Sequence, residues 1–308
     1  MFHANRLPDI PVGFEPCLYL TPKHLQTQTD EVVYAFYLFK NEERTASAVF
    51  QCTEGNGNSW FSPPKAPFGG IQFDLTCTRA EISFLLHCVE EWIISHGGKK
   101  LVIKEAPWCY NESISAVPDF YKPNGYLLKA IHENHFIKIT DCIYAPLIHP
   151  AERRRLRKCK SAGFVGEMYE SADSDIVYAF LESCRSEKGH IIPLTINQLK
   201  TLLLNFPNEI KVFAVKRHYK IVALTVTILV NRSILYNFLS ASLLAYNAYS
   251  PAVLLTETVY NFCRDQQISI LDLGISLDKN GNEKASLIRF KENIGGAKSY
   301  KATYEKVF

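Results

Sequence analysis

The sequence predicts an α/β protein with a mixed sheet, divided into two domains that repeat one order of elements. Both halves of the chain read β-β-α-β. At 308 residues the chain has the length of about two ordinary domains. Its composition, 47% hydrophobic and 21% charged, is that of a globular protein. We place the domain boundary near Pro150, which gives domains 1–150 and 151–308.

The first half opens with two β-rich runs, Glu31 to Phe39 and Thr45 to Cys52, whose polar connection predicts an antiparallel hairpin. Thr78 and Glu81 have the spacing of a capping box and mark the start of a helix. Apolar residues at helical period predict that one face of this helix packs on the sheet: Ile82, Leu85, Leu86, Val89 and Ile93. Two further strands are predicted at residues 100–105 and 137–147.

The second half follows an arginine-rich helix that we predict at His149 to Ala162. Its strands are expected at residues 209–215, 219–230, 233–241 and 268–272. A helix from about Ala252 lies between the last two of these strands. Two more helices are predicted at residues 173–187 and 195–205. Pro193 lies between them, and Pro207 follows the second.

The apolar runs, the N-terminal residues and the cysteines indicate the cellular compartment of the protein. The longest apolar runs, such as Ile221 to Val230, are shorter than the ~20 residues that span a bilayer, so no membrane span is predicted. The N-terminal residues lack the charged start and apolar stretch of a signal peptide. Nine cysteines occur without a Cys-x-x-Cys pair, which favours neither a disulfide framework nor a zinc ribbon. We therefore expect a cytoplasmic protein.

Several classes of chemistry have no support in the sequence. The nine histidines form no His-x-x-x-His or Glu-x-x-His pattern, since His132 and His135 have only Glu133 nearby, and we expect no metal cofactor. There is no Gly-x-Ser-x-Gly elbow, no P-loop and no Gly-x-Gly-x-x-Gly, which disfavours hydrolase, NTPase and dinucleotide-binding functions. A net charge of +3 does not by itself imply a nucleic-acid or membrane partner.

Two strand-to-helix junctions are candidate anion sites, because amides at a helix N-terminus attract phosphates. The first runs from Phe68, Gly69 and Gly70 to Thr78, and the second from Ser240 to Pro251, just ahead of Ala252. The alternative for each is an ordinary connection between sheet and helix. The second junction has no glycine, which disfavours a tight phosphate-binding loop there.

A basic cluster occupies residues 152–160. Six of these nine positions are basic: Arg153, Arg154, Arg155, Arg157, Lys158 and Lys160. Leu156 and Cys159 are three residues apart, so they share a helical face that can dock while the arginines face outward. The cluster is either a solvated linker helix or a contact for RNA or a phosphate-rich substrate.

A third candidate site follows the predicted strand at 268–272. Ligands in open α/β sheets often bind at such strand ends. We interpret Asp272 as orienting an amine or hydroxyl nucleophile, Ser276 as hydrogen-bonding it, and Lys291 as neutralising an oxyanion or a phosphate. The alternative assigns Asp272 to a helix cap and Lys291 to solvent. Glu105, at the end of the corresponding strand of the first half, is the symmetric candidate for a general base.

These segments resemble tandem GNAT-like proteins of the FemABX type, the peptidoglycan bridge aminoacyltransferases, and especially their small bacterial members described as GNAT N-acetyltransferases. The resemblance covers most of the chain. In the first half it rests on Ser62-Pro63, on Pro67-Phe68-Gly69-Gly70-Ile71 and on residues 102–107. In the second half it rests on residues 153–158, 206–210 and 272–276, and on Leu287-Ile288-Arg289-Phe290-Lys291-Glu292 with Gly295-Gly296.

The resemblance implies two tandem GNAT-like domains and the transfer of an acyl or aminoacyl group to an amine. The implied donor is acyl-CoA or aminoacyl-tRNA, and the implied acceptor is a small molecule or a peptidoglycan-precursor-like amine. The segment before Pro251 lacks the glutamine or arginine and the spaced glycines of the GNAT acyl-CoA loop. The helical hairpin that some relatives use for aminoacyl-tRNA is not evident either, so the choice of donor stays open.

Three functions remain as hypotheses. The first is an N-acyltransferase that works by direct attack of an amine, without a covalent intermediate. The second is a non-catalytic protein of the same fold that binds a small molecule or a protein. Strands splayed apart on either side of the second junction, with an open groove beside Ala252, would count against it. The third is an RNA-binding module that uses the basic cluster, including Arg153 and Arg154.

Overall fold

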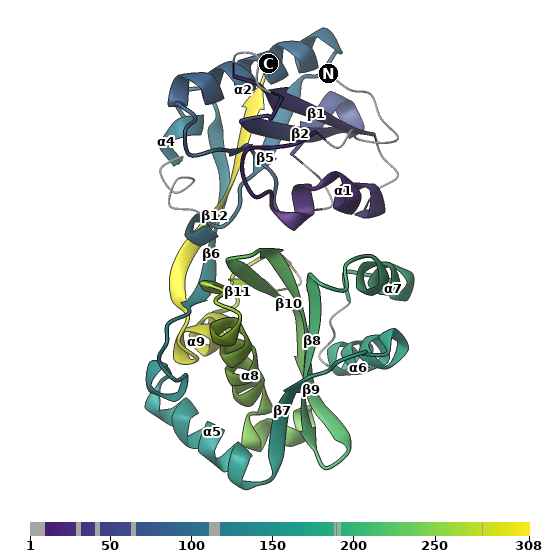
Figure 1. Cartoon of the computed structure of the whole chain (residues 1–308), viewed down its shortest axis with the longest axis vertical. Coiled ribbons are helices and arrows are strands. Elements are labelled where there is room, and N and C mark those ends of the chain that lie inside the picture. The colour runs from purple at the N-terminus through teal and green to yellow at the C-terminus, as the bar shows by residue number, and fades with distance from the viewer. Residues whose placement is uncertain are drawn as a thin grey trace. The chain divides into compact units, whose positions relative to one another are not determined.

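The computed structural model describes residues 10–28, 32–40, 44–62, 66–110, 118–187, 189, 192–278 and 280–308. The chain forms two compact units, one of residues 1–132 with 299–308 and one of residues 133–298. Each unit combines helices with a sheet that has both parallel and antiparallel strand pairs (Figure 1). The predicted α/β class with a mixed sheet is therefore confirmed.

The two units differ from the expected ranges 1–150 and 151–308. The chain enters the second unit within strand β6 (Leu127–Lys138) and returns to the first within strand β12 (Ala297–Val307). Because both crossings lie inside strands, neither has the exposed linker that usually marks a domain boundary.

The first unit is built on strands in the order β1-β2-β3-β5-β12, with β4 paired to β2. The predicted hairpin is confirmed as the antiparallel pair of β1 and β2, although residues 41–43 of its connection lie outside the described residues. The elements of this unit, besides parts of β6 and β12, are η1 (Leu18–Leu20), α1 (Pro22–Gln28), β1 (Val33–Leu38), β2 (Ala48–Gly55), η2 (Asn56–Asn58), β3 (Ser59–Phe61), β4 (Gln72–Phe73), α2 (Arg79–Ser95), β5 (Lys100–Lys104), η3 (Trp108–Tyr110) and α4 (Pro118–Tyr121).

Helix α2 follows the sequence prediction closely. Its N-cap Thr78 and Glu81 form the predicted capping box. The five residues of the predicted apolar stripe are all buried, and the helix contacts β1 and β2. The core of the unit also takes in Phe50 and Trp60 from the sheet. This helix therefore anchors one face of the first sheet.

The strand predicted at 137–147 is wrong. Strand β6 ends at Lys138, and the following residues turn into the short helix η4 (Ala145–Leu147). The buried Tyr260 fixes this turn, because its hydroxyl bonds the carbonyl oxygens of Thr140 at 3.2 Å and Cys142 at 3.0 Å. A side chain of the neighbouring helix thus takes the bonds that a strand partner would have made.

The second unit is built on strands in the order β6-β11-β10-β9-β8-β7. Figure 1 shows α8 on one face of this sheet and α6 and α7 on the other. The predicted arginine-rich helix is confirmed as α5, with Leu156 and Cys159 buried. The other elements are β7 (Phe164–Met168), α6 (Ser174–Ser186), α7 (Ile196–Asn205), β8 (Ile210–Arg217), β9 (Lys220–Asn231), β10 (Ile234–Ser242), η5 (Leu244–Tyr249), α8 (Pro251–Asp265), β11 (Ile270–Ile275) and α9 (Ala285–Asn293), and α5 spans Pro150–Ser161.

The predicted strands and helices of this half are confirmed, with shifts of one to three residues at their ends. Every helix within the described ranges is too short or too polar to traverse a lipid bilayer.

Candidate functional site

The parallel strands β10 and β11 separate part of the way along their length. They pair only at residues 234–236 with 270–272, although β10 continues to Ser242 and β11 to Ile275. On its other side β10 stays paired with β9 as far as Ser242, so it is the side toward β11 that opens. Backbone groups along an edge that has lost its partner strand can bind a ligand. The second unit therefore has a candidate site where Tyr236 and Asp272 end the pairing.

Asp272 lies at this point and is buried. Its Oδ1 atom accepts hydrogen bonds from Asn134 Nδ2 and from the backbone N–H of Gly274, each at 2.8 Å. The register of β11 against β6 shifts between Asp272 and Gly274, and Gly274 has a φ of +73°, which favours glycine. A Cβ atom on Gly274 would lie 3.1 Å from the Tyr236 ring. Asp272 therefore holds a β-bulge and does not cap a helix.

Lys291 of helix α9 reaches the same bulge. Its Nζ atom donates to the carbonyl oxygens of Gly274 at 2.8 Å and of Ile275 at 2.9 Å. The side chain is buried, so the alternative that assigned it to solvent is wrong. Burial lowers the pKa of Lys291 to about 8, and the negative charge of Asp272 opposes this shift. An ammonium group has three donors, so one N–H is left for a further acceptor.

Ser276 follows directly on β11 and is also buried. Its backbone oxygen accepts from Lys284 N at 2.8 Å, whereas its Oγ atom has no hydrogen-bond partner among the described residues. A buried hydroxyl without a partner is uncommon and is a ready contact for a ligand. The structure thus gathers Asp272, Ser276 and Lys291, three of the residues selected from the sequence, around one bulge.

Three more residues of this cluster were missed in the sequence: Asn134 on β6, Tyr236 on β10 and Arg185 on α6. Tyr236 lies opposite Asp272 in the parallel pairing. Burial raises the pKa of Tyr236, the charge of Asp272 raises it further, and Arg185 lowers it. These residues belong to elements far apart in the sequence and to no motif. Only the tertiary packing of β6, β10 and α6 brings them together.

The N-terminus of helix α8 lies at the second predicted junction. Ser240 is exposed on β10, and Ala252 is half-buried in the first turn of α8. Ser250 precedes the helix with a φ of +51°, makes no side-chain cap, and the first turn has no acidic residue. Lys158 of helix α5 lies close by, because its Nζ atom donates to Ala248 O at 3.0 Å. This helix start is therefore uncapped and next to a cation, which suits a phosphate group.

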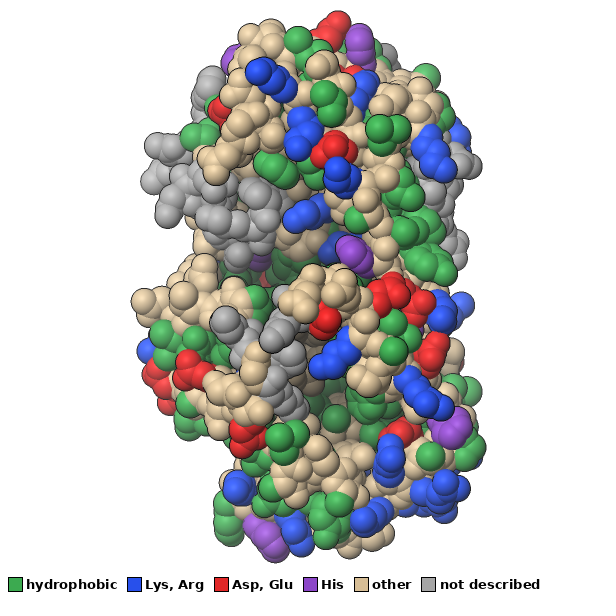
Figure 2. Space-filling view, turned by 180° about the vertical axis from the view of Figure 1, so that it is seen from behind, with side chains coloured by type: hydrophobic (Ala, Val, Ile, Leu, Met, Phe, Trp, Pro, Cys, Tyr) green, Lys and Arg blue, Asp and Glu red, His purple; other side chains and the backbone are tan. Residues whose placement is uncertain are grey.

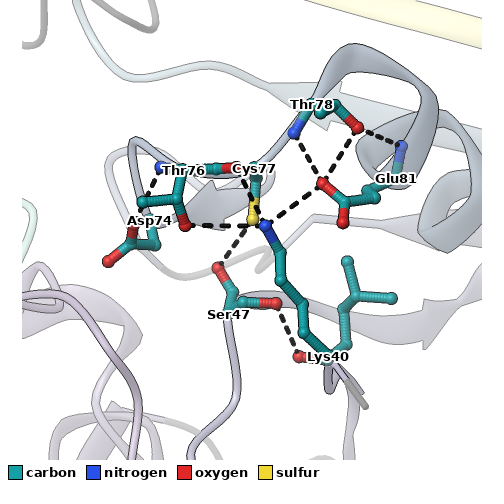
Figure 3. Close-up of polar contacts among 8 residues, drawn as sticks. Lys40, Ser47, Asp74, Thr76, Cys77, Thr78 and Glu81 are labelled. Atoms are coloured by element: carbon teal, nitrogen blue, oxygen red, sulfur yellow. Dashed lines mark hydrogen bonds and ion pairs between the residues drawn. The ribbon is translucent and has the colours of Figure 1, made fainter.

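The N-terminus of helix α2, at the first junction, is different. Figure 3 shows Glu81 folded back over the helix start, where its Oε2 atom accepts from Thr78 N at 2.7 Å. Lys40 pairs with the same carboxylate at 3.2 Å and donates to Thr76 O at 2.8 Å. The protein's own carboxylate thus occupies the place of an external anion, which favours the alternative of an ordinary connection here.

The residues Phe68, Gly69 and Gly70 pack within the first unit. Phe68 is buried edge-on against Tyr19 with ring centres 5.4 Å apart. Gly69 N donates to Lys104 O at 2.8 Å, and Gly70 N donates to Ser62 Oγ. Their amides are therefore used inside the protein. The three residues line a cavity of about 20 Å³, which has room for about one water molecule.

Glu105 lines the same cavity and is only 3% exposed. Its carboxyl accepts a hydrogen bond of 3.3 Å from the indole nitrogen of Trp108. Burial raises the pKa of Glu105 to about 7, and the hydrogen bond from Trp108 lowers it slightly. Glu105 belongs to the first unit, whereas Asp272, Ser276 and Lys291 belong to the second.

The basic cluster is largely engaged within the second unit. Arg153 donates to Pro146 O at 3.3 Å and to Ile148 O at 3.4 Å. Arg155 pairs with Glu152 at 2.6 Å, and Lys160 pairs with Glu257 at 2.6 Å. Arg154 and Arg157 are exposed and lack a partner in the described part of the chain. Figure 2 shows Lys and Arg side chains over the end of the unit to which α5 belongs.

Several known structures have a similar fold. The crystal structure of FemX superposes with a TM-score of 0.73 at 14% identity, covering 96% of this chain and 93% of that one. The C-terminal domain of a putative lysylphosphatidylglycerol synthetase from Agrobacterium fabrum has a TM-score of 0.60 at 11% identity, covering 91% and 84%. A tandem GNAT protein from the clavulanic acid biosynthesis pathway has a TM-score of 0.51 at 7% identity, covering 89% and 83%.

No protein-family model matches the sequence, and no curated protein matches it significantly. The fold nevertheless defines the class, because the chain has the tandem GNAT fold over nearly its whole length. The similarity to FemX over 96% of the chain confirms the fold that the sequence resemblance implied. Identities of 14% or less establish the fold and leave the reaction to be argued from the site.

Proposed function

We propose that this chain is an N-acyltransferase that transfers an acyl or aminoacyl group directly to an amine, and that its second unit carries the reaction. The observation that carries the proposal is the separation of β10 from β11 where Asp272, Ser276 and Lys291 gather. Ligands in α/β proteins bind where neighbouring strands diverge. The tandem GNAT fold supports the same reaction class by analogy.

The reaction needs few groups from the protein. The amine attacks the carbonyl carbon of a thioester or ester, a tetrahedral oxyanion forms, and the thiol or hydroxyl leaves, so no covalent enzyme intermediate is required. The third N–H of Lys291 is suited to stabilise that oxyanion, because two carbonyl oxygens fix the ammonium in place. The unpartnered hydroxyl of Ser276 is suited to hydrogen-bond the nucleophile.

Asp272 is better suited to positioning than to catalysis. Its Oδ1 atom is used by Asn134 and by the N–H of Gly274. It therefore fixes the Leu273–Gly274 peptide, which directly precedes the Gly274 carbonyl that holds Lys291. Glu105 lies in the first unit, so its role as a general base stays a separate prediction, which rests on a carboxyl pKa of about 7 that lets it accept a proton near neutral pH.

The donor that fits the second unit carries phosphate groups. Helix α8 has an uncapped start with no acidic residue in its first turn, whereas the start of α2 is filled by Glu81. Acyl-CoA and aminoacyl-tRNA both carry phosphates, and both remain candidates. One of the similar folds, the tandem GNAT protein, is described as being without AcCoA, which makes acetyl-CoA the first donor to test. The proposed acceptor is a small-molecule or peptidoglycan-precursor-like amine in the cytoplasm.

The alternatives have less support. A non-catalytic binding protein would not need the strands to separate next to buried polar side chains. An RNA-binding module would draw on a basic cluster in which Arg153, Arg155, Lys158 and Lys160 are already engaged. Loss of salt-dependent RNA binding on replacing Arg154 and Arg157 by alanine would favour the RNA-binding module instead.

Thermal unfolding of the full-length protein with acetyl-CoA, coenzyme A or aminoacyl-tRNA tests the proposal. A donor at about one hundred times its Kd stabilises the folded protein by about 2.7 kcal/mol, so the Tm should rise with the true donor. The absence of any rise with acyl-CoAs and with aminoacyl-tRNA would contradict the proposal. Turnover with a panel of amines then identifies the acceptor.

Ala252 provides a matched pair of variants for this experiment. Ala252→Asp places a negative charge in the first turn of α8, which stabilises the helix itself but repels a phosphate. Ala252→Ser introduces a polar side chain at the same position without adding charge. We expect the donor-induced rise in Tm to disappear in Ala252→Asp and to persist in Ala252→Ser. Equal responses of the two variants would place the donor elsewhere.

A further inference from the structure

Strand β6 presents a second polar cluster on the face opposite Asn134. Side chains alternate along a strand, so Glu133 and His135 project together from the face that Asn134 does not use. Glu292 of helix α9 joins them, and one potential ligand atom from each of the three residues lies within 4.8 Å of the others. All three residues belong to the second unit. The cluster therefore combines one imidazole with two carboxylates.

Polar atoms in this cluster are buried without hydrogen bonds. His135 is 0% exposed, and neither of its ring nitrogens has a hydrogen-bond partner among the described residues. The Oε1 atom of Glu133 is likewise buried and makes no hydrogen bond. It lies 3.2 Å from His135 Nε2, but the two groups are not oriented for a hydrogen bond. Native proteins rarely leave such groups unsatisfied, and an ion or a water molecule is the usual explanation.

The spacing of these atoms is also compatible with a shared metal ion. Metal-to-nitrogen and metal-to-carboxylate distances are about 2.1 Å for Zn²⁺ and similar ions. Two such bonds to atoms 3.2 Å apart enclose an angle of about 100° at the metal, between the octahedral and tetrahedral values. An imidazole ligand favours first-row transition metals over Mg²⁺ and Ca²⁺, which prefer oxygen alone.

The ammonium group of Lys298 pairs with both carboxylates of this cluster. Its Nζ atom lies 3.2 Å from Glu133 Oε2 and 3.3 Å from Glu292 Oε1. Half of its side chain is exposed, so the ammonium can move into solvent. It contacts the outer carboxylate oxygens and leaves Glu133 Oε1 and His135 unsatisfied. A metal ion would therefore compete with Lys298 for the carboxylates while it satisfies the buried atoms.

We infer that Glu133, His135 and Glu292 bind one divalent first-row transition metal ion, such as Zn²⁺, in competition with the ammonium of Lys298. The sequence did not predict this metal site, because two ligands at i and i+2 on a strand and a third on a distant helix form no recognisable motif. The inference does not depend on the proposed acyl transfer.

Metal binding to the untagged, EDTA-treated full-length chain tests the inference. Isothermal titration and elemental analysis with Zn²⁺, Mn²⁺ and Mg²⁺ should give one tightly bound Zn²⁺ for each chain and no comparable binding of Mg²⁺. Lys298→Met should bind Zn²⁺ about tenfold more tightly, because it removes a competing charge a few ångströms away. Glu292→Gln and His135→Gln should weaken binding at least about tenfold.

A surface pair of the same geometry serves as the control. His87 and Glu91 on α2 lie 3.2 Å apart but are two-thirds exposed, and Glu91→Gln should leave both stoichiometry and affinity unchanged. If His135→Gln fails to fold, Glu292→Gln and Lys298→Met still test metal binding, because both positions are partly exposed. Unchanged binding in Glu292→Gln, loss of binding in Glu91→Gln, or no Zn²⁺ binding by either wild type or Lys298→Met would overturn the inference.

Discussion

Replacement of Glu105 by glutamine tests how the first unit tolerates a buried carboxyl. Burial raises the pKa of Glu105 from 4.5 to about 7. Below pH 4.5 both the folded and the unfolded chain carry the proton. As the pH rises from 4.5 to 7 the unfolded chain loses this proton first, so the free energy of unfolding falls, and above pH 7 the loss is complete.

The size of the effect follows from the two pKa values. Each pKa unit corresponds to about 1.4 kcal/mol, so the full difference between 4.5 and about 7 is on the order of 3 kcal/mol. Most of this difference, about 2–3 kcal/mol, falls between pH 5 and pH 8. Glutamine keeps the shape of the side chain and can still accept from Trp108. The stability of Glu105→Gln relative to wild type should therefore increase by about 2–3 kcal/mol between pH 5 and pH 8.

Urea unfolding followed by tryptophan fluorescence measures this unit alone, because the three tryptophans, at positions 60, 92 and 108, all lie in it. Glu90 provides the contrast, since it is equally buried but pairs with Lys306 Nζ at 2.7 Å. Glu90→Gln should lose about 2 kcal/mol of stability, because the lysine keeps its charge without its partner. The reasoning is refuted if Glu105→Gln and wild type show the same dependence on pH.

Three further predictions follow from single contacts. Lys291→Met should reduce kcat by about 10²–10³-fold with little change in the donor-induced Tm rise, and full turnover in this variant would remove Lys291 from the mechanism. Gly274→Ala and Gly281→Ala each place a side chain at positive φ, which lowers the free energy of unfolding by about 1–2 kcal/mol. Only the new Cβ atom at Gly274 also contacts the Tyr236 ring. Urea unfolding monitored by circular dichroism should therefore show a larger loss for Gly274→Ala, and equal losses would contradict the packing argument. Thr78→Ala should destabilise the first unit by about 1 kcal/mol in urea, whereas Thr78→Ser should remain close to wild type. Equal stability of the two variants would mean that the capping box contributes nothing.

The features that sequence reasoning predicted are those set by neighbours along the chain. The capping box of α2 needs only Thr78 and Glu81, three residues apart, and the buried stripe of that helix repeats with the helical period. The hairpin of β1 and β2 and the docked face of α5 follow from similarly local patterns. The fold class could be predicted because these local elements recur in the same order in both halves.

The features that it missed depend on contacts between distant segments. The end of β6 is fixed by a hydroxyl of Tyr260, which no local pattern near Thr140 reveals. Strand β12 alternates only weakly between buried and exposed residues, and its place beside β5 is a property of the sheet. Asp272, Ser276 and Lys291 were selected one at a time, whereas the bulge at Gly274 that joins them depends on β6 and α9.

The division of the chain has a consequence for synthesis on the ribosome. The second unit is one continuous segment, residues 133–298, and can complete its sheet as soon as that segment has emerged. The first unit includes residues 299–308, which pair with β5 and are made only after the whole of the second unit. The part of the chain that is synthesised first is therefore the part that finishes folding last, and until β12 arrives β5 has one open edge exposed to aggregation or to chaperones.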